Sequence, residues 1–496
     1  MAGFAHNLIE LDMKKTSVRL MTRVSQGAFM VALAALGAGC ASVTGHHEPL
    51  AQVALSDVRL PEASAQARAN WPKNGWWRQY RDEQLNALIE QAFADSPNLE
   101  VLASRVESAK VTADGVKKLS YPSGGIRLAP TEQTYSENYI YPASLWDGWK
   151  DSGLVSAAIS WDLDLWGRHR MQYRAALGQA AAAELEYEAA RQAIAANIVG
   201  LHGQLSALDV RLGLLDAQIK LQNTNKQRWT ERERAGLQPV QTSIQVDGVI
   251  AQLEQLRGTF MAQRDISTAQ LAALMGKTPA QMPRISAPSR WTALNLPNEL
   301  PANILGARPD IAAAQHYIVA ATENVKAVRT EFYPNINLNV SAGFQAIGLD
   351  KLFKAGSSFQ TVEPAITLPI FSGAGLNAKL RSQQAALDSA VAQYNQTVYQ
   401  AVADAGQQLA NYRNSSVQIT QQQRLLANTE RLAGLVQSRY TQGISAQMDS
   451  LISQVNLLSA KDALVADYAV RRAQEAKLAV SLGTGFDGVW QQQSNK

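Results

Sequence analysis

Two very long segments without proline constrain the fold of this chain more than any other feature. In the first, residues 169–233, apolar residues recur at alternating steps of four and three. This heptad spacing predicts a helix that packs along its length as a coiled coil. A helix of about 65 residues would extend about 98 Å, a length that a compact globule does not need. The heptad positions are Ile194, Ile198, Leu201, Leu205, Leu208, Leu212, Leu215 and Ile219.

The second proline-free segment, residues 376–440, belongs to a repeat of the first half of the chain. Several short motifs recur at nearly constant separation, and such agreement over a long stretch indicates a tandem duplication. We expect one unit at 82–278 and the other at 300–485. The matches 212 residues apart are Pro97 with Pro309 and Pro122 with Pro334, and those 207 apart are Gly236 with Gly443 and Gly276 with Gly483.

Both units follow the same order of elements. Each is expected to contain a first helix, a strand pair, the long helix and a return helix. The return helices would reach only about 57 Å, so each should abut another short helix, and the helix that precedes each strand pair is the candidate. The expected elements are a first helix at 82–119, strand pairs at about 121–166 and 334–371, long helices at 169–233 and 376–440, and return helices at 238–275 and 445–481.

Four short segments show the two-residue period of strands. In residues 335–345, NINLNVSAGFQ, apolar residues take the even positions and polar or small residues the odd positions, which predicts a two-faced strand. In SGLVSAAISWDLDLW, Val155 through Leu165 alternate with Ser156, Ser160, Asp162 and Asp164. FQTVEPAITLPIF and, more weakly, GGIRLAPTEQTY complete the set.

These strands have two interpretations. For one amphipathic strand, a small antiparallel sheet that covers a helical core is favoured. A length of about 11 residues, which crosses a bilayer when tilted, and polar faces of Ser, Asn and Asp suited to a wet lumen favour a membrane barrel instead. Aromatic residues typical of a membrane interface lie between the first two strands, at Tyr139, Tyr141, Trp146 and Trp149.

Four strands cannot close a barrel, because open sheet edges are excluded from lipid. Bacterial barrels begin at eight strands, so the chain must pool strands with copies of itself, two copies giving eight and three giving twelve. The apolar faces would then meet lipid, and the polar faces would line a pore.

The N-terminus resembles an export signal. Lys14, Lys15, Arg19 and Arg23 precede an apolar run, GAFMVALAALGAGC, that ends at Cys40. Its 13 apolar residues would give about 20 Å of helix, short of the ~30 Å hydrocarbon core, so we expect a signal peptide over 1–39, with Met13 as the initiator. Cys40 is the only cysteine and resembles the acylated cysteine of a bacterial lipobox. One departure from that pattern is that Leu36 lies four residues before Cys40 and Gly37 lies three before it, where a larger aliphatic residue is preferred.

Charge and motifs exclude other classes of function. The net charge is +4, of which +2 belongs to the signal segment, and the remainder is no footprint for nucleic acid. No zinc-protease, serine-hydrolase or phosphate-loop motif is present, and the six histidines form no ligand set. We therefore expect no enzyme activity, no metal and no cofactor apart from the lipid on Cys40. Asp162 and Asp164 are read as the wet side of the strand-to-helix corner rather than as an acid–base pair.

Six stretches together resemble the outer membrane factor lipoproteins of the TolC superfamily, the exit ducts of tripartite efflux pumps. The resemblance covers nearly everything after Cys40. It implies a mainly helical homotrimer with a twelve-strand membrane barrel and a helical tunnel (α-barrel), working in the outer membrane with a periplasmic adaptor and an inner-membrane pump. The stretches are WWRQYRDEQLNALIEQAFADSPNLEVLASRVESA (76–109), WDLDLWGRHR (161–170), ARPDIAAAQ (307–315), FYPNINLNVSAGF (332–344), LPIFSGAGLNAKL (368–380) and RYTQGISAQMDSL (439–451).

The same resemblance implies the substrates. Drugs and organic acids are both exported by such proteins, and we expect drugs or aromatic acids here. A duct for type I protein secretion and a coiled-coil structural lipoprotein are the alternatives. The coiled-coil lipoprotein would explain the heptads but not four strands of bilayer length.

The resemblance also implies a periplasmic gate in the segment from Tyr440 to Val455. Relatives commonly place an aliphatic residue at Met448, an acid at Ile452 and an arginine at Val455. This chain keeps Tyr440 and the bulky apolar Met448, lacks the acid and the arginine, and has its nearest carboxylate at Asp449.

Asp449, Met448 and the two turns each have an ordinary alternative. Asp449 would form an acidic ring in a pore or would simply be a first-turn acid at a helix N-terminus. Met448 would form a constriction or pack in the coiled coil. The turns at Gly236-Leu237 and Gly443-Ile444 would dock the adaptor, and each glycine would also close its helix.

Overall fold

The computed structural model describes residues 47–55 and 74–483, apart from 139, 238, 289, 295, 297–305, 307 and 371. The expected signal peptide, Cys40, Tyr139 and the C-terminal tail expected at 486–496 lie outside the described residues. The chain divides into two compact units, each drawn from several stretches of sequence. Unit 1 includes 109–180 and 317–391, and unit 2 includes 51–108, 181–316 and 392–496.

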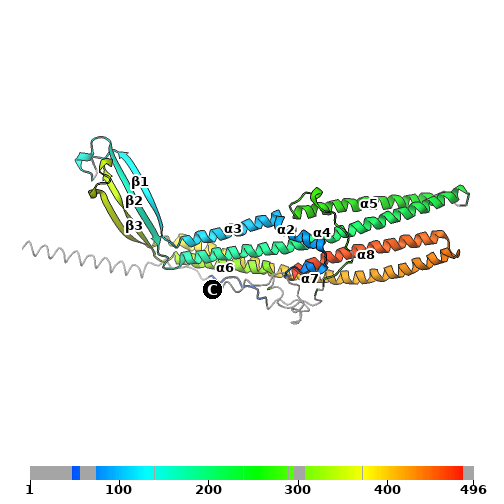
Figure 1. Ribbon diagram of the computed structural model, residues 1–496. Coiled ribbons are helices and arrows are strands. Elements are labelled where there is room, and N and C mark those ends of the chain that lie inside the picture. The colour runs from blue at the N-terminus through cyan, green and yellow to red at the C-terminus, as the bar shows by residue number, and fades with distance from the viewer. Residues whose placement is uncertain are drawn as a thin grey trace, which may run out of the picture. The chain divides into compact units, whose positions relative to one another are not determined.

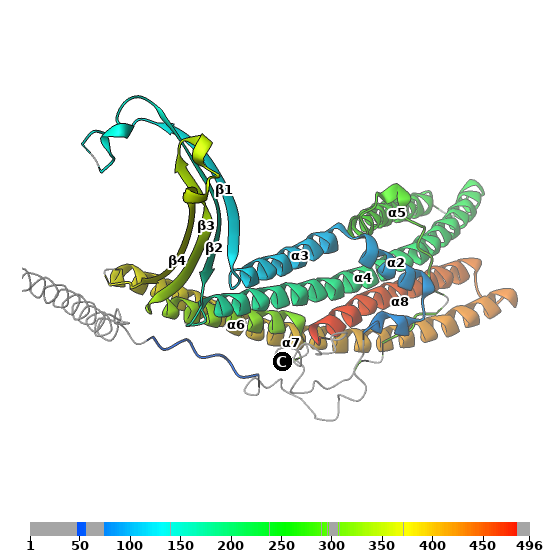
Figure 2. The same ribbon diagram turned by 60° about the vertical axis from the view of Figure 1, so that its left-hand side comes forward.

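Unit 1 contains one four-stranded antiparallel sheet in the order β1-β2-β3-β4 (Figures 1 and 2). Residues that pair across the strands point to the same side of the sheet, and successive pairs along a strand alternate between an apolar and a polar side, as the two-residue period predicts. Ile126, Leu128 and Val362 on the apolar side are 76%, 70% and 69% exposed, so this chain alone does not cover that side. The strands are β1 (Ser123–Gln133), β2 (Lys150–Asp162), β3 (Asn335–Ile347) and β4 (Ser358–Thr367).

The second strand is shorter than the sequence pattern predicts. β2 ends at Asp162, and Asp164 lies in the left-handed region with φ 44°, so the expectation that Asp162 and Asp164 share one strand face is wrong. The physical reason is a helix cap: the Asp164 carboxylate accepts hydrogen bonds from the backbone N–H groups of His169 and Arg170, at 3.0 and 3.2 Å. An acid at this position satisfies free N–H groups of the following helix.

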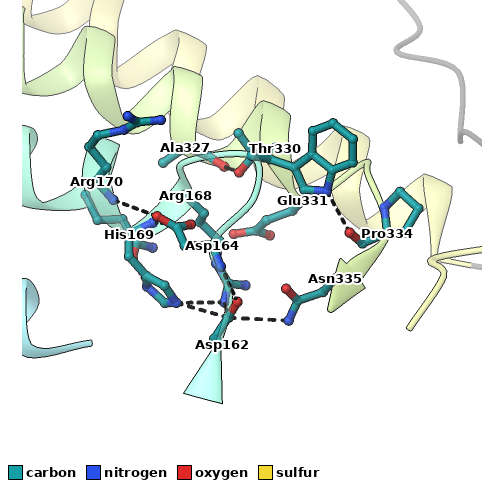
Figure 3. A network of polar contacts seen from close by, with 12 residues as sticks. Asp162, Asp164, Arg168, His169, Arg170, Ala327, Thr330, Glu331, Pro334 and Asn335 are labelled. Atoms are coloured by element: carbon teal, nitrogen blue, oxygen red, sulfur yellow. Dashed lines mark hydrogen bonds and ion pairs between the residues drawn. The ribbon is translucent and has the colours of Figure 1, made fainter. Parts of the chain in front are cut away.

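Asp162 belongs instead to a polar network at the strand-to-helix corner (Figure 3). Its Oδ2 accepts a hydrogen bond from Arg168 Nη2 at 2.7 Å and lies 3.0 Å from His169 Nε2. Asn335, the first residue of β3, also reaches Asp162 Oδ2 at 3.4 Å. The carboxylate therefore ties the end of β2 to the start of β3 and to helix α4 (Arg168–Arg234), which gives it a structural role.

In unit 2, six of the eight heptad positions of α4 are buried, and Leu201 and Ile219 are partly buried. Leu208, Leu212 and Leu215 form an apolar cluster with Phe260 of the return helix α5 (Gln241–Leu274). Helix α7 (Gly373–Thr441) and its return helix α8 (Gln447–Ser481) repeat this arrangement. Among the described residues, no helix has the length and apolar character needed to cross a membrane.

The first helix of the first repeat is interrupted, which corrects the expectation of one helix over 82–119. Helix α2 (Glu83–Asp95) ends at Ser96, and α3 (Pro97–Lys118) begins at the next residue. Ser96 has an extended conformation with ψ 119°, because proline disfavours the helical region for the residue before it and lacks an N–H. In the second repeat, α6 (Pro309–Thr330) also begins at a proline.

Each return helix ends against the start of a short helix, as expected, and we call these two contacts joints. In the first joint, Gly276 approaches the α2–α3 break so closely that a Cβ there would lie 2.7 Å from the Asp95 carbonyl oxygen. In the second, Arg308 Nη1 donates to the Ser481 carbonyl oxygen at 2.8 Å, beside the end of α8. The two repeats therefore share one plan but fasten their joints by different chemistry.

Candidate functional site

The turns that close the two hairpins of unit 2 have the same backbone structure. Gly236 and Gly443 both have φ 74°. Leu237 N–H bonds the Arg232 carbonyl at 2.9 Å, and Ile444 N–H bonds the Arg439 carbonyl at 2.9 Å. This six-to-one bond, together with a left-handed glycine, defines a Schellman motif, which ends a helix and satisfies its last carbonyls. The capping role expected for both glycines is confirmed.

Both turns present an apolar side chain to the outside. In a Schellman motif, the residue after the glycine usually packs back on the helix, but Leu237 and Ile444 are 66% and 70% exposed. The turns lie at the same end of unit 2 (Figures 1 and 2). Both hairpins of unit 2 therefore carry an exposed apolar side chain at this end.

The candidate gate residues flank the second turn: Tyr440 lies at the end of α7, and the others lie near the start of α8. Gln437 of α7 is bonded by Ser450 Oγ and, at 3.2 Å, by Gln454 Nε2, and this contact fixes which face of α8 meets α7. Asp449 and Ile452 lie on the face that no described residue of the chain covers, and Ile452 is 52% exposed. The half-buried candidates are Tyr440, Met448 and Val455.

The structure therefore brings the gate candidates into one short region, but their side chains differ in exposure. Asp449 is the acidic residue of the first turn of α8, as its ordinary alternative requires. It is also exposed, as a pore ring requires. Met448 and Val455, seven residues apart, lie at the edge of the exposed face, where they would contact a neighbouring helix or narrow a passage.

A buried charged cluster in unit 2 was not predicted from the sequence. Arg472 of α8 is 2% exposed, and its guanidinium lies 4.6 Å from the centre of the Tyr80 ring. Glu475, 1% exposed, accepts hydrogen bonds from Tyr80 Oη at 3.1 Å and from Arg471 Nε at 2.8 Å. The cluster links segments that lie hundreds of residues apart in sequence, so no local pattern signals it.

His202 of α4 completes this cluster. Its side chain is fully buried, with Nδ1 3.5 Å from Arg472 Nη1 and 3.8 Å from Asp82 Oδ2. Burial lowers the pKa of His202 to about 4, although the charge of Asp82 acts in the opposite direction. The imidazole is therefore neutral at neutral pH. Gly203 leaves room for the Arg472 side chain of this cluster, because a Cβ on residue 203 would lie 2.9 Å from Arg472 Cδ.

The described residues give no sign of a metal centre. No group of three or more His, Cys, Asp or Glu among them is arranged to hold a metal ion. Cys40, the expected site of lipid attachment, lies outside the described residues, and its role stays a prediction.

The family model described as outer membrane efflux protein matches residues 88–277 and 300–484. The multidrug resistance outer membrane protein MdtQ of Escherichia coli O157:H7 is 28% identical over 431 residues, which cover 82% of this chain and 87% of that protein. The fusaric acid resistance protein FusA of Burkholderia cepacia is 30% identical over 370 residues, 72% of this chain and 68% of that protein.

Among solved structures, the outer membrane protein VceC from Vibrio cholerae superposes with a TM-score of 0.73 at 31% identity. The match covers 84% of this chain and all of VceC. The two stretches matched by the family model correspond to the two repeats. These similarities confirm the expected fold class, long helices in tandem-repeated units with strands for a membrane β-barrel.

Proposed function

The chain belongs to the outer membrane efflux protein family, and we propose that three copies of it form the exit duct of a tripartite efflux system. It is an outer membrane protein and an efflux channel component. The family and its solved relatives are channels rather than enzymes, and the proposed duct needs no catalytic activity of this chain. Its partners would be a periplasmic adaptor and an inner-membrane pump.

The observation that carries assembly from several copies is the sheet. β1 and β4 each have one edge without a partner strand among the described residues, and lipid does not tolerate open edges. The apolar side of the sheet is exposed in the single chain, as a lipid-facing surface would be. Other copies of the chain supply the missing strands in the simplest arrangement.

The exposed turns support docking of the adaptor. Gly236 and Gly443 would set the backbone of each turn, and Leu237 and Ile444 would enter apolar pockets on the adaptor. This contact would use side chains that contribute little to the fold of the chain itself, since both are more than half exposed.

For the gate, we propose that Met448 and Asp449 face the narrow end of the tunnel. Tyr440, Ile452 and Val455 would line the same constriction. The exposed position of Asp449 on α8 supports this arrangement, because three symmetry-related carboxylates around a pore would attract cations.

We propose drugs or small aromatic acids as the substrates. The name of MdtQ refers to multidrug resistance and that of FusA to fusaric acid resistance. A duct selects little by itself, so the pump would determine the range of compounds. We also propose that a lipid on Cys40 anchors the mature N-terminus.

Conductance of single channels in planar bilayers tests the function. We expect discrete cation-preferring steps from the wild-type protein and a loss of cation preference in Asp449→Ala. Met448→Ala should raise the open probability if Met448 narrows the gate. Steps that are identical in wild type and Asp449→Ala would remove Asp449 from the gate, and an absence of steps in all three proteins would contradict the duct.

A further inference from the structure

The two outer strands of the sheet carry the two charged residues that lie in mid-strand. Arg127 is the fifth of 11 residues in β1, and Glu363 is the sixth of 10 residues in β4. The inner strand β3 has no ionisable residue, and the charges of β2 lie at its ends. Both side chains are exposed, and neither has an ion pair with another described residue.

Arg127 and Glu363 point to the same side of the sheet. Ser123 pairs with Ser160, which pairs with Asn339, which pairs with Glu363, and paired residues share a face. Arg127 lies four residues from Ser123, and residues an even number apart on a strand also share a face. That face carries the serine, asparagine and threonine side chains, so it is the polar one.

The two charges cannot meet within one copy. Three strand spacings separate β1 from β4, about 14 Å, and the four-residue offset adds about 13 Å along the strands. A side chain of either residue spans only part of that distance. Each charge is, however, on an outer strand, where the next copy of the chain would pair.

The strand ends show where the next copy would align. Counted from the row of Ser123 toward the helices, β2 extends two residues further to Asp162, and β3 and β4 extend four further, to Asn335 and Thr367. This stepwise stagger is what closure of a barrel requires. A stagger of four to six residues per four strands corresponds to a tilt of about 35° to 46°, within or close to the range of closed barrels.

A stagger of four places Ser123 of the neighbouring copy opposite Thr367. Arg127 of that copy is then directly opposite Glu363, at the Cβ separation of about 5 Å that suits an ion pair. A stagger of six places Ala129 opposite Glu363, with Arg127 on the diagonal and still within reach of its long side chain.

We propose that Arg127 of one copy and Glu363 of the next form an ion pair across the β1–β4 seam, on the polar face of the sheet, and that this pair sets the register in which copies assemble. The proposal rests on the trimeric duct proposed above. It also explains the opposite signs: pairing of β1 with β1, or of β4 with β4, would bring like charges together, which disfavours wrong assemblies.

Disulfide cross-linking of the full-length protein tests the register. Directly opposed strand residues have a Cα separation that a disulfide can bridge, so the double variant Arg127→Cys/Glu363→Cys should give covalent trimers on a non-reducing gel. Ala129→Cys/Glu363→Cys would do so if the stagger is six. Leu128→Cys/Glu363→Cys is the matched control, because Leu128 points to the opposite face; the single variants control for Cys40.

Charge reversal tests the ion pair. Arg127→Glu or Glu363→Arg alone should lower the ratio of trimer to monomer in mild detergent by roughly tenfold, given three pairs per trimer, and the double reversal should restore it. Glu132→Arg, on the other face of β1 near its end, should leave the ratio unchanged. A double reversal that does not restore the trimer would overturn the pair.

The outcomes separate the inference from the proposed function. Trimers that conduct but are cross-linked at neither position would overturn the proposed seam and leave the duct intact. A wild-type protein that neither forms trimers nor conducts would overturn both. Covalent trimers from the Leu128 control, without those from Arg127 or Ala129, would show that the opposite faces meet and would also overturn the seam.

Discussion

At the scale of single residues, the cluster around His202 holds several ionisable side chains away from water. Asp82 and Arg472 lie beside the imidazole, Tyr80 packs against the Arg472 guanidinium, and Glu475 lies beyond them on α8. Nε2 of His202 is buried without a hydrogen-bond partner among the described residues. A proton added to this ring would place a further positive charge beside Arg472.

We therefore expect acid to destabilise the protein through His202. Its pKa is about 4 in the folded chain against an ordinary value near 6.5, so the unfolded chain binds the proton first. The stabilising contribution of the neutral ring is complete above about pH 6.5 and is lost progressively as the pH falls toward 4. By linkage, the loss at pH 5 is about 2 kcal/mol per chain.

Thermal unfolding followed by helical circular dichroism between pH 7.5 and 5 measures this effect. His202→Gln should show a shallower fall of the melting temperature than wild type. Burial raises the pKa of Glu475, which acts in the opposite sense, but Glu475 is present in both proteins. Equal pH slopes for the two proteins would contradict the assignment to His202.

At the scale of elements, one glycine decides how closely two strands approach. A Cβ on Gly343 of β3 would collide with the Val155 carbonyl oxygen of β2. Gly125, on the same polar face of β1, has open space around its missing Cβ. The two glycines therefore look alike in the sequence and differ in the sheet.

We expect Gly343→Val to prevent assembly, because separation of β2 from β3 breaks the middle of the sheet. Gly125→Ala should assemble normally. Heat-modifiable migration of membrane extracts on gels reports trimer content for both variants, and normal trimers from Gly343→Val would show that the strands have room to part.

The exposed tips of the two hairpins give a prediction at the same scale. The double variant Leu237→Asp/Ile444→Asp should abolish capture of the purified adaptor and reduce resistance in cells, while the melting temperature stays within about 2 °C of wild type. Val249→Asp, at an exposed apolar position of α5 (40% exposed), is the control and should bind the adaptor. Unimpaired capture by the double variant would exclude the tips from docking.

The sequence predicted the periodic elements well and the isolated side chains poorly. The heptad of α4 and the alternation of β3 are local patterns with many members, so a single exception does not hide them. The break at Ser96 was predictable, because Pro97 disfavours a helical residue before it and suits the first position of a new helix. The pairing of His202 with Arg472 joins residues 270 positions apart, and periodicity carries no information about such contacts.

At the scale of the whole molecule, the strands and the expected lipid are two separate attachments to the membrane. Four strands per chain would hold the trimer in the bilayer through their apolar faces. One acyl-modified residue would add an anchor at the surface. The strand attachment would be the stronger of the two, since it would join every copy in one closed sheet.

We therefore expect Cys40→Ser to lose the lipid and keep most of its transport. Metabolic labelling with radioactive palmitate should mark the wild type and leave the variant unlabelled, while drug resistance of cells that carry the variant stays near wild type. A wild-type protein without label would contradict lipidation. Cells that carry Cys40→Ser and are fully sensitive to the drug would show that the anchor is essential.

The two joints between short helices give the duplicated chain an unequal response to ionic strength. The first joint depends on the close packing of Gly276 against the α2–α3 break, and dissolved salt has little effect on such a contact. The second depends on Arg308, which also pairs with the partly exposed Asp310 and Asp404 at 2.8 and 3.3 Å. Added ions weaken these pairs to a limited extent, because the Arg308 side chain is itself largely buried. Two halves built on one plan would thus differ in stiffness as the salinity of the surroundings rises, and the second half would loosen first.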